Sequence, residues 1–168
     1  QYSEAGVPLL VLHGIFGSLS NWGWHSKQLA EQYAVYGVDL RNHGDSPHSD
    51  RLDYQVMAED VRELIVRLGL KSCYIVGHSM GGKVAMQLAL IFPDLVEKLV
   101  VIDIAPVSYP KNANGHMDFL DGIDAVKLDE IKSRAEAEVT LKDYIPEEAT
   151  RKFLLTNLCR NKEGLFEW

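Results

Sequence analysis

A serine flanked by glycines stands between an apolar run and a helical pattern, within residues 74–82 (YIVGHSMGG). A serine hydroxyl is a weak nucleophile unless a sharp turn exposes it and a base can reach it. Small residues two positions before and two after, here Gly77 and Gly81, let strand and helix approach each other without collision. The pattern therefore predicts Ser79 as a nucleophile. A helix that begins at Met80 would direct its free amides toward Ser79, so the Met80 N–H is placed to bind an oxyanion.

Apolar runs and helical patterns alternate along the first part of the chain. The predicted strands cover residues 7–12, 34–40, 73–76 and 99–104, and the predicted helices cover residues 19–33, 54–68 and 80–92. Strands that are apolar on both faces and alternate with helices indicate a mostly parallel α/β sheet with helices on both faces. After Pro106 the strand runs stop, and three amphipathic helices are predicted over residues 116–131, 134–144 and 147–160. We predict a core over residues 1–105 and a helical insert over residues 106–168.

Composition excludes several function classes. The chain has 17 Lys and Arg against 24 Asp and Glu, a formal net charge of −7, whereas nucleic-acid binding requires a basic face. No apolar run is long enough for a membrane span, and the polar start at Gln1 gives no sign of a signal peptide. Cys73 is predicted to be a small buried hydrophobe, and the two cysteines, Cys73 and Cys159, favour a reducing compartment. The expected location is the cytoplasm.

Four segments stand in an order that resembles the α/β-hydrolase superfamily: Val11-Leu-His-Gly14, Asp39-x-Arg-x-x-Gly-x-Ser46, residues 77–82 and Val101-Ile-Asp-Ile-Ala-Pro106. Within it the chain is most similar to YbfF-type esterases and abhydrolase-domain-11 proteins, over residues 7–110. The resemblance implies hydrolysis of carboxylic esters or acyl thioesters through an acyl-serine, without metal or organic cofactor. It also implies that residues 13–17 form the second part of an oxyanion hole, with Ile15 as the expected N–H donor and Phe16 as the alternative.

A triad also needs an acid and a base. Asp103 ends the fourth predicted strand and should lie beside Ser79, because neighbouring parallel strands end at one edge of the sheet. It is either the triad acid or a helix or turn cap. In this superfamily the histidine follows the acid in the chain, and here only His116 does so; it opens the helical insert and fits the role poorly.

We therefore expect the catalytic histidine to lie outside this chain. The resemblance implies eight strands where four are found, so we expect that the core is incomplete. Either the chain is a fragment, or a second chain supplies the remaining strands and the histidine. The expected partner is otherwise a small-molecule ester or thioester.

Several residues have two open interpretations. His78 and Trp22 could line the substrate pocket, with Phe16 and Trp24 extending an aromatic wall, or the aromatic residues could pack in the core. The loop from Asp39 to Ser46 is either an active-site rim or architecture held by Arg41 and a carboxylate. Apolar residues of the insert either line an acyl pocket or only pack together: Met117, Phe119, Leu120, Phe153, Leu154 and Leu158. C–C bond cleavage, perhydrolysis and a non-catalytic binding module remain as alternatives to ester hydrolysis.

Overall fold

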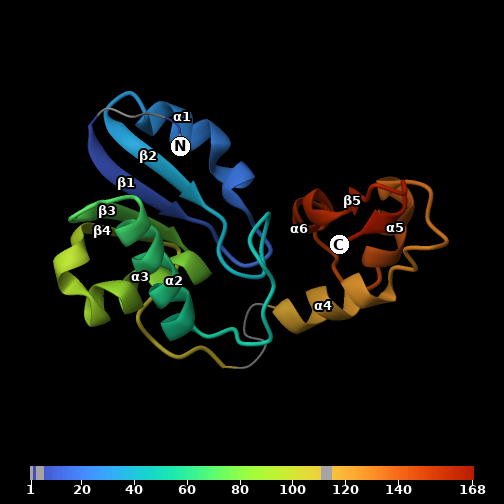
Figure 1. The fold of residues 1–168 in the computed structure, drawn as a ribbon. Coiled ribbons are helices and arrows are strands. Elements are labelled where there is room, and N and C mark those ends of the chain that lie inside the picture. Colours follow the sequence, from blue (N-terminus) through green and yellow to red (C-terminus); the bar gives the residue numbers. More distant parts are fainter. Residues whose placement is uncertain (1, 3–5, 111–114) are drawn as a thin grey trace. The chain divides into compact units, whose positions relative to one another are not determined.

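The computed structural model describes residues 2, 6–110 and 115–168, in two compact units that span residues 1–106 and 107–168. The first unit contains a parallel sheet with the strand order β2-β1-β3-β4 (Figure 1). Its strands are β1 (Val7–Leu12), β2 (Tyr33–Val38), β3 (Cys73–His78) and β4 (Val96–Ile102). The predicted parallel α/β core is confirmed.

Two 3-10 turns and three helices connect these strands: η1 (Leu19–Trp22), α1 (Gly23–Leu29), α2 (Tyr54–Arg67), α3 (Met80–Ile91) and η2 (Pro93–Leu95). Helix α2 begins where the Asp53 side chain accepts a 2.8 Å hydrogen bond from the Val56 N–H, an ordinary N-cap. The chain turns away after it at Gly69, whose φ of 69° suits glycine. The single helix predicted over residues 19–33 is wrong. It divides into η1 and α1 and ends at Leu29, because Tyr33 already pairs with Val7 in the sheet.

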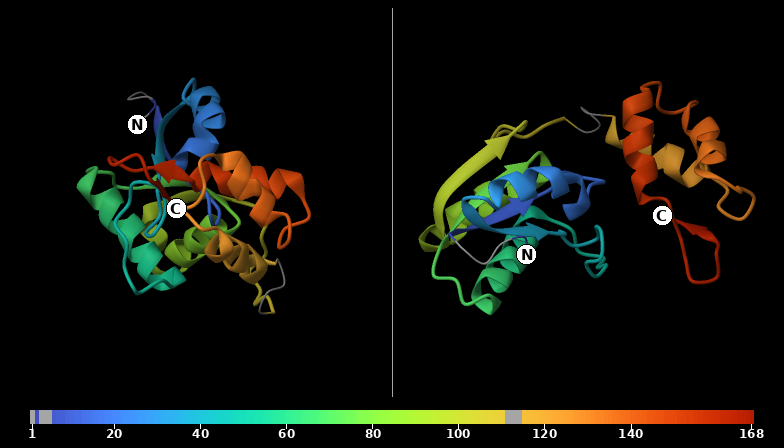
Figure 2. Two further views of the ribbon diagram at one scale, coloured as in Figure 1. Left: turned by 90° about the vertical axis from the view of Figure 1, so that its right-hand side faces the viewer. Right: turned by 90° about the horizontal axis from the view of Figure 1, so that it is seen from above.

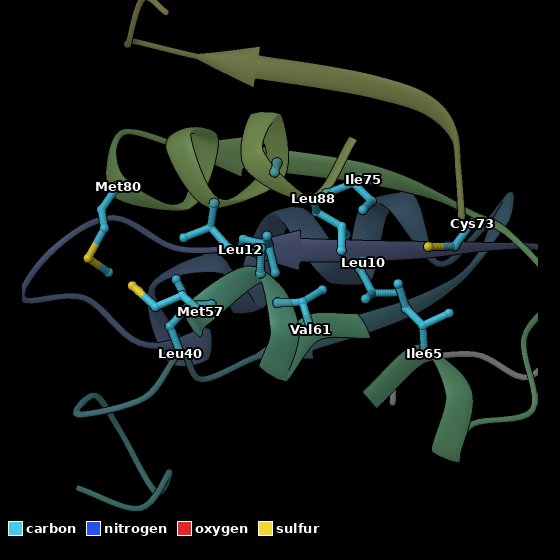
Figure 3. Close-up of a cluster of buried hydrophobic side chains, with 13 residues drawn as sticks. Leu10, Leu12, Leu40, Met57, Val61, Ile65, Cys73, Ile75, Met80 and Leu88 are labelled. Atoms are coloured by element: carbon cyan, nitrogen blue, oxygen red, sulfur yellow. The ribbon is translucent and has the colours of Figure 1, made fainter. Parts of the chain in front are cut away.

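Strand β1 lies at the centre of two apolar layers. Leu10 and Leu12 point toward α2 and α3, where they join a buried cluster with Met57, Val61 and Leu88 (Figure 3). Leu9 and Val11 point to the opposite face and pack with Val35, Trp22 and Leu29 from β2, η1 and α1. Helices therefore cover both faces of the sheet, as Figure 2 shows for this unit. The alternation follows from the two-residue period of a strand.

Strand β4 differs from the prediction of a buried strand over residues 99–104. It begins at Val96 and ends at Ile102, so Asp103 and Ile104 lie beyond it. Its Val100 is 50% exposed, and Leu99 and Ile102 are also exposed. The reason is that β4 is an edge strand, which pairs only with β3 among the described residues.

The second unit is smaller and mostly helical. It contains α4 (His116–Ala125), α5 (Arg134–Leu141), α6 (Glu148–Leu154), η3 (Leu155–Asn157) and a short hairpin of β5 (Cys159–Arg160) with β6 (Phe166–Glu167). The helix predicted over residues 116–131 ends early, where Val126 turns extended and buries its side chain. The one predicted over residues 147–160 stops before Leu158, whose carbonyl accepts two hydrogen bonds from the Arg134 guanidinium. The expectation of no strands after Pro106 is wrong, because β5 and β6 form an antiparallel hairpin.

Apolar residues of the second unit fall into two groups. Leu154 and Leu158 are fully buried, together with Leu141, so they form the core of this unit. Met117 and Leu120 on α4 are 53% and 42% exposed. The simple packing interpretation therefore holds for the first pair, whereas the second pair leaves an apolar side of α4 in contact with solvent.

The two cysteines occupy different environments and neither forms a disulfide. Cys73 is fully buried in the core, where burial raises the pKa of its thiol to about 11. This confirms the prediction of a small buried hydrophobe, because a thiol that stays protonated is unreactive. Cys159 is exposed. In the described part of the chain, the helices are too short or too polar to cross a membrane.

Candidate active site

Ser79 occupies a strained corner between β3 and α3. Its φ and ψ angles are 50° and −117°, a conformation that a residue with a side chain adopts only when its surroundings impose it. The Ser79 N–H donates to the Ile102 carbonyl at 3.0 Å, and the Ser79 carbonyl accepts from the amides of Gly82 and Lys83. These bonds anchor the corner to β4 on one side and to α3 on the other. We call residues 77–82 the elbow.

The glycines of the elbow are required by close backbone contacts. A Cβ atom on Gly77 would lie 2.4 Å from the Gly81 carbonyl oxygen, and one on Gly81 would lie 2.5 Å from the carbonyl oxygens of Leu12 and His13. Real Cβ atoms do not come this close to backbone, so a side chain at either position would force strand and helix apart. The spacing read from the sequence thus corresponds to two actual contacts.

The loop after β1 lies against the nucleophile. A Cβ atom on Gly14 would be 3.3 Å from the Ser79 Cβ, so the loop of residues 13–17 passes directly beside Ser79. The Gly81 amide is bonded to the His13 carbonyl, and the amides of Gly82 and Lys83 are bonded to Ser79. In the first turn of α3, the Met80 N–H is therefore the amide without an acceptor among the described residues. Such an amide can bind a negative oxygen next to Ser79.

Asp103 lies beside the elbow in the register of the sheet. His78 pairs with Ile102, and the Asp103 Oδ2 atom is 3.8 Å from the His78 Nε2 atom. This distance exceeds a hydrogen bond, and the Asp103 side chain is 84% exposed, so its oxygens remain accessible to another donor. Asp103 has a φ of 58°, and no helix begins directly after it among the described residues, so it is not a helix cap.

No histidine among the described residues bonds to the Ser79 hydroxyl, which has no hydrogen-bond partner there. His13 is buried, and both its ring nitrogens are bonded to backbone. His43 contacts the Arg41 carbonyl through Nδ1. His25 is exposed on α1, where its ring lies 5.4 Å from that of Trp22. His48 is exposed in the loop after β2, and His116 belongs to the second unit.

The residues predicted to line the pocket are divided by the structure. The His78 ring lies beside Gly14 and 6.3 Å from the Trp22 ring, measured between centroids. Trp22 also packs against Leu9 and Val11, as the core interpretation predicts. Trp24 is 68% exposed and contacts His25 instead.

Comparison with known proteins identifies the family. The family model for the alpha/beta hydrolase fold matches residues 7–153. The mouse protein named sn-1-specific diacylglycerol lipase ABHD11 is 43% identical, over 98% of this chain and 55% of its own length. Esterase YbfF from Escherichia coli is 36% identical, over 92% of this chain and 60% of its own length. The chain belongs to the α/β-hydrolase family.

A solved structure agrees with this assignment to the α/β hydrolases. It is titled marine microorganism esterase, and it superposes with a TM-score of 0.94 at 42% identity, over 99% of this chain and 65% of that chain. The resemblance to YbfF-type esterases and abhydrolase-domain-11 proteins is therefore confirmed. This chain spans little more than half the length of the curated relatives it matches.

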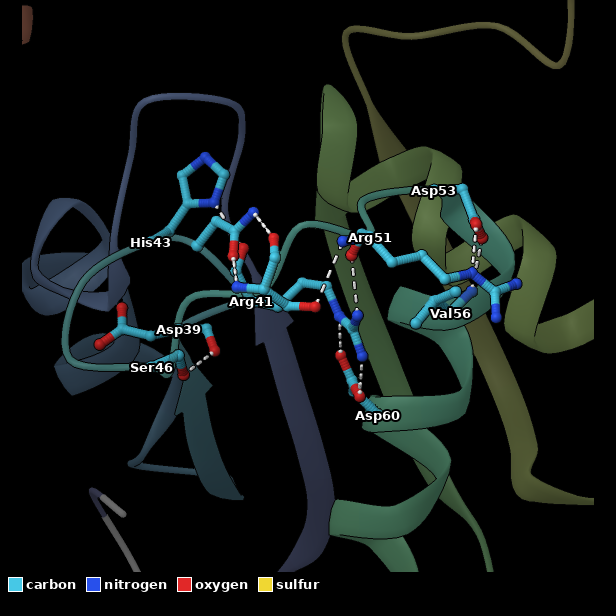
Figure 4. A network of polar contacts seen from close by, with 10 residues as sticks. Asp39, Arg41, His43, Ser46, Arg51, Asp53, Val56 and Asp60 are labelled. Carbon is cyan, nitrogen blue, oxygen red and sulfur yellow. Dashed lines mark hydrogen bonds and ion pairs between the residues drawn. The ribbon is translucent and has the colours of Figure 1, made fainter.

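In the loop after β2, the side chains of Arg41 and Ser46 are bonded within the fold. In the Asp39 loop (residues 39–53), the Arg41 guanidinium donates to both carboxylate oxygens of Asp60 at 2.6 and 2.7 Å, and to the Arg51 carbonyl at 2.8 Å (Figure 4). The Ser46 hydroxyl donates to the Asp39 carbonyl. These bonds favour the interpretation of the loop as architecture.

The Asp39 carboxylate has a structural role that its own residue type and spacing do not indicate. Its oxygens accept hydrogen bonds from the Leu19 N–H at 2.7 Å and the Asp45 N–H at 3.2 Å. It thereby ties the start of η1 to the end of β2. The signal in the sequence is Gly44, because a Cβ atom there would lie 2.3 Å from the Asp39 carboxylate carbon. Elsewhere in the described residues, no three His, Cys, Asp or Glu side chains gather as a metal site.

Proposed function

We propose that this chain carries the nucleophile and the oxyanion hole of a serine hydrolase that cleaves carboxylic esters or acyl thioesters. The observation that carries the proposal is the Ser79 corner: a strained serine whose hydroxyl has no partner among the described residues, beside the loop at Gly14. Strain and an unpaired hydroxyl stabilise nothing in the fold, and they are what a nucleophile requires. The names of the relatives, esterase and diacylglycerol lipase, support ester substrates.

Each residue then has a role in acyl transfer. The Ser79 oxygen attacks the ester or thioester carbonyl, its proton passes to a base, and the resulting oxyanion is held by the Met80 N–H and by the N–H of Ile15 or Phe16. The alcohol or thiol leaves with that proton, and an acyl-serine remains. Water then attacks the acyl-serine, the acid product leaves and the Ser79 hydroxyl is restored. This chemistry needs no metal or organic cofactor.

Asp103 is the proposed triad acid. Its exposed carboxylate at the end of β4 can accept a hydrogen bond from an imidazole and stabilise the imidazolium that forms when Ser79 loses its proton. His78 and Trp22 are the proposed contacts for the acyl or alcohol portion of the substrate, because their rings adjoin each other beside the oxyanion loop.

The catalytic base is proposed to come from a polypeptide segment outside these 168 residues. In the described part of the first unit, His13 and His43 are hydrogen-bonded to backbone, and no histidine bonds to the Ser79 hydroxyl. The exposed Asp103 carboxylate can accept a hydrogen bond from a further imidazole. The exposed apolar edge of β4 supports such a segment, because an unpaired strand with exposed Val100 is a site for pairing with another strand. A later part of the same polypeptide or a second chain could supply it. Residues 106–168 are the proposed lid, and the two free cysteines fit a reducing compartment such as the cytoplasm.

The test of the nucleophile is covalent labelling with a fluorophosphonate, which reacts only with an activated serine. Labelling at Ser79 in the longest natural form of the protein, lost in Ser79→Ala, is the expected result. Ser46→Ala is the matched control and should label as the wild-type protein does. The Ser46 hydroxyl already donates to the Asp39 carbonyl, so it should not react with the reagent. A protein that binds esters but leaves Ser79 unlabelled would instead be a non-catalytic binding module.

The test of the base is the 168-residue chain by itself. We expect little turnover of a short ester such as p-nitrophenyl acetate, because no described histidine reaches the Ser79 hydroxyl. Full esterase rates in this chain that His116→Ala abolishes would contradict the proposal. In that case the second unit would supply the base.

A further inference from the structure

We propose that the active site extends along a row of aromatic side chains, from the elbow to α1, and that this row selects esters carrying an aromatic ring. The inference rests on the proposed serine hydrolase function and names its substrate class. We call His78, Trp22, His25 and Trp24 the aromatic row. His25 and Trp24 form its outer end and are the specificity-determining residues.

The inner end of the aromatic row adjoins the groups proposed for catalysis. The His78 Nδ1 atom lies 3.0 Å from a Cβ placed on Gly14, and that Cβ lies 3.3 Å from the Ser79 Cβ. The His78 Nε2 atom is 3.8 Å from the Asp103 Oδ2 atom. The His78 side chain is 39% exposed, so a substrate whose carbonyl reaches Ser79 can contact this ring.

The other three rings continue from His78 in successive contacts. The centroid of the Trp22 ring is 6.3 Å from that of His78 and 5.4 Å from that of His25. The His25 and Trp24 rings meet edge to face, with their centroids 5.0 Å apart. These spacings lie within the range of interacting aromatic rings. The four rings therefore form a connected path from the neighbourhood of Ser79 to the surface of α1.

Packing within the fold accounts for the inner part of the aromatic row only. Trp22 packs against Leu9 and Val11, whereas His25 is exposed and Trp24 is 68% exposed. An indole ring is a large apolar group, and in folded proteins most of its surface is normally buried. Trp24 thus presents aromatic surface at the end of a path that begins beside Ser79, where a bound substrate can cover it.

The ring geometry favours a planar guest over a saturated one. Neighbouring rings of the row are inclined to each other by 57°, 56° and 88°, so none of these pairs is stacked face to face. A planar aromatic group can stack on a ring face or meet it edge-on, and either arrangement adds to the free energy of burying its apolar area. A saturated ring of the same size lacks this contribution. The aromatic row therefore predicts a preference for aromatic esters over their saturated analogues.

The experiment compares kcat/KM for matched esters in the longest natural form of the protein. 3-Phenylpropyl acetate and 3-cyclohexylpropyl acetate share the acyl group, the spacer and the number of carbon atoms. We expect the wild-type protein to prefer the phenyl ester by about 2- to 10-fold. A site that responds to apolar area alone would instead favour the cyclohexyl ester, whose ring has the larger surface.

A second pair of esters tests the acyl arm of the substrate. Ethyl 4-phenylbutanoate and ethyl 4-cyclohexylbutanoate carry the same two rings on the acid instead of the alcohol. A phenyl preference in the first pair assigns the aromatic row to the alcohol arm, and one in the second pair assigns it to the acyl arm. The absence of a phenyl preference in both pairs would overturn the inference.

Substitutions in the outer part of the row attribute the preference to these rings. Trp24→Leu should bring the ratio of phenyl to cyclohexyl kcat/KM close to one, and His25→Leu should lower it in part. Trp24→Phe should retain the preference, because it keeps an aromatic ring. Gln28→Ala, at an exposed position of the same helix, is the matched control and should leave the ratio unchanged. A ratio that Trp24→Leu does not change would overturn the inference, and an accompanying fall in thermal midpoint would show that Trp24 packs against another polypeptide segment instead.

A binding measurement separates this inference from the proposed function. In Ser79→Ala, which cannot form an acyl-serine, the phenyl ester should shift the Trp24 indole N–H resonance much more than the cyclohexyl ester does, because aromatic rings produce ring-current shifts. An unmoved Trp24 resonance with the phenyl ester well above its KM would overturn the inference. A wild-type protein that neither reacts at Ser79 nor hydrolyses esters contradicts the proposed function, whereas hydrolysis without a phenyl preference contradicts only the role of the aromatic row.

Discussion

Two loops at the same edge of the sheet, the elbow and the Asp39 loop, contain similar residue types but use them differently. In the Asp39 loop the side chains of Arg41 and Ser46 are bonded to Asp60 and to backbone (Figure 4), and the Asp39 carboxylate accepts from the Leu19 N–H. In the elbow the backbone of Ser79 and Gly81 makes the hydrogen bonds, and the Ser79 hydroxyl has no partner among the described residues. A polar group committed to the fold is unavailable for chemistry, whereas one left free in a strained corner is available.

The largest expected effect concerns the acid beside the elbow. Asp103→Asn should lower kcat by about 10³- to 10⁴-fold, because an amide cannot stabilise the imidazolium of the base. The thermal midpoint should change little, since the Asp103 side chain is 84% exposed. Steady-state kinetics and thermal unfolding measure the two effects. Asp45→Asn, which alters an exposed acid of the Asp39 loop, serves as the control and should leave kcat nearly unchanged. Equal losses of kcat in the two variants would show that Asp103 has no special role beside Ser79.

A smaller effect is expected when the backbone contact of the elbow is disturbed. Gly77→Ala should lower the free energy of unfolding by about 2–4 kcal/mol, because its Cβ would lie 2.4 Å from the Gly81 carbonyl oxygen. Fluorophosphonate labelling of the folded fraction should also be lost, because strand and helix must separate. Gly164→Ala is a control with open space around its Cβ, although its φ of 82° adds a small strain. Normal labelling of Gly77→Ala would show that the corner tolerates a side chain.

The Asp39 loop should respond in stability alone. Arg41→Met removes the bidentate pair with Asp60 and the bond to the Arg51 carbonyl, and should cost about 1–2 kcal/mol of unfolding free energy. The cost is small for a bidentate pair because the Asp60 side chain is 41% exposed and can bind water instead. Urea unfolding and the rate of Ser79 labelling are the measurements. A fall in labelling rate without a fall in stability would make Arg41 part of the active site.

The smallest expected effect is the pH dependence of the free energy of unfolding that arises from His13, whose buried ring joins Gly14 to Leu40. Burial holds the pKa of His13 below its ordinary value of 6.5, so the unfolded chain binds a proton that the folded chain does not. This contribution to stability is present above pH 6.5 and is lost as the pH falls toward the folded pKa, by at most about 1.4 kcal/mol per pH unit. Urea unfolding between pH 7.5 and 5 measures it, and His13→Asn should flatten the slope. An unchanged slope in that variant would assign the effect to another group, such as His116, whose pKa burial also lowers.

The sequence alone determined the features that depend on local patterns. The alternation of apolar strands and amphipathic helices predicted the parallel sheet, and the glycine spacing predicted the corner at Ser79. Both rest on local features, namely residue periodicity and the close approach of Gly77 to Gly81. The family followed from four short segments in order. Element ends were less predictable: the helix over residues 19–33 was divided because pairing of Tyr33 with β1 outweighs helical periodicity.

Only the tertiary structure decided which polar residues are committed and which are free. Arg41 and Asp60 lie 19 residues apart, and His13 and Leu40 lie 27 apart, so their bonds exist only once β1, β2 and α2 have packed together. The exposure of β4 likewise depends on which strands pair beside it, and not on its own apolar residues. Residue type and spacing indicate what a side chain can do. Its partners in space, which long-range packing selects, decide whether it supports the fold or remains free to react.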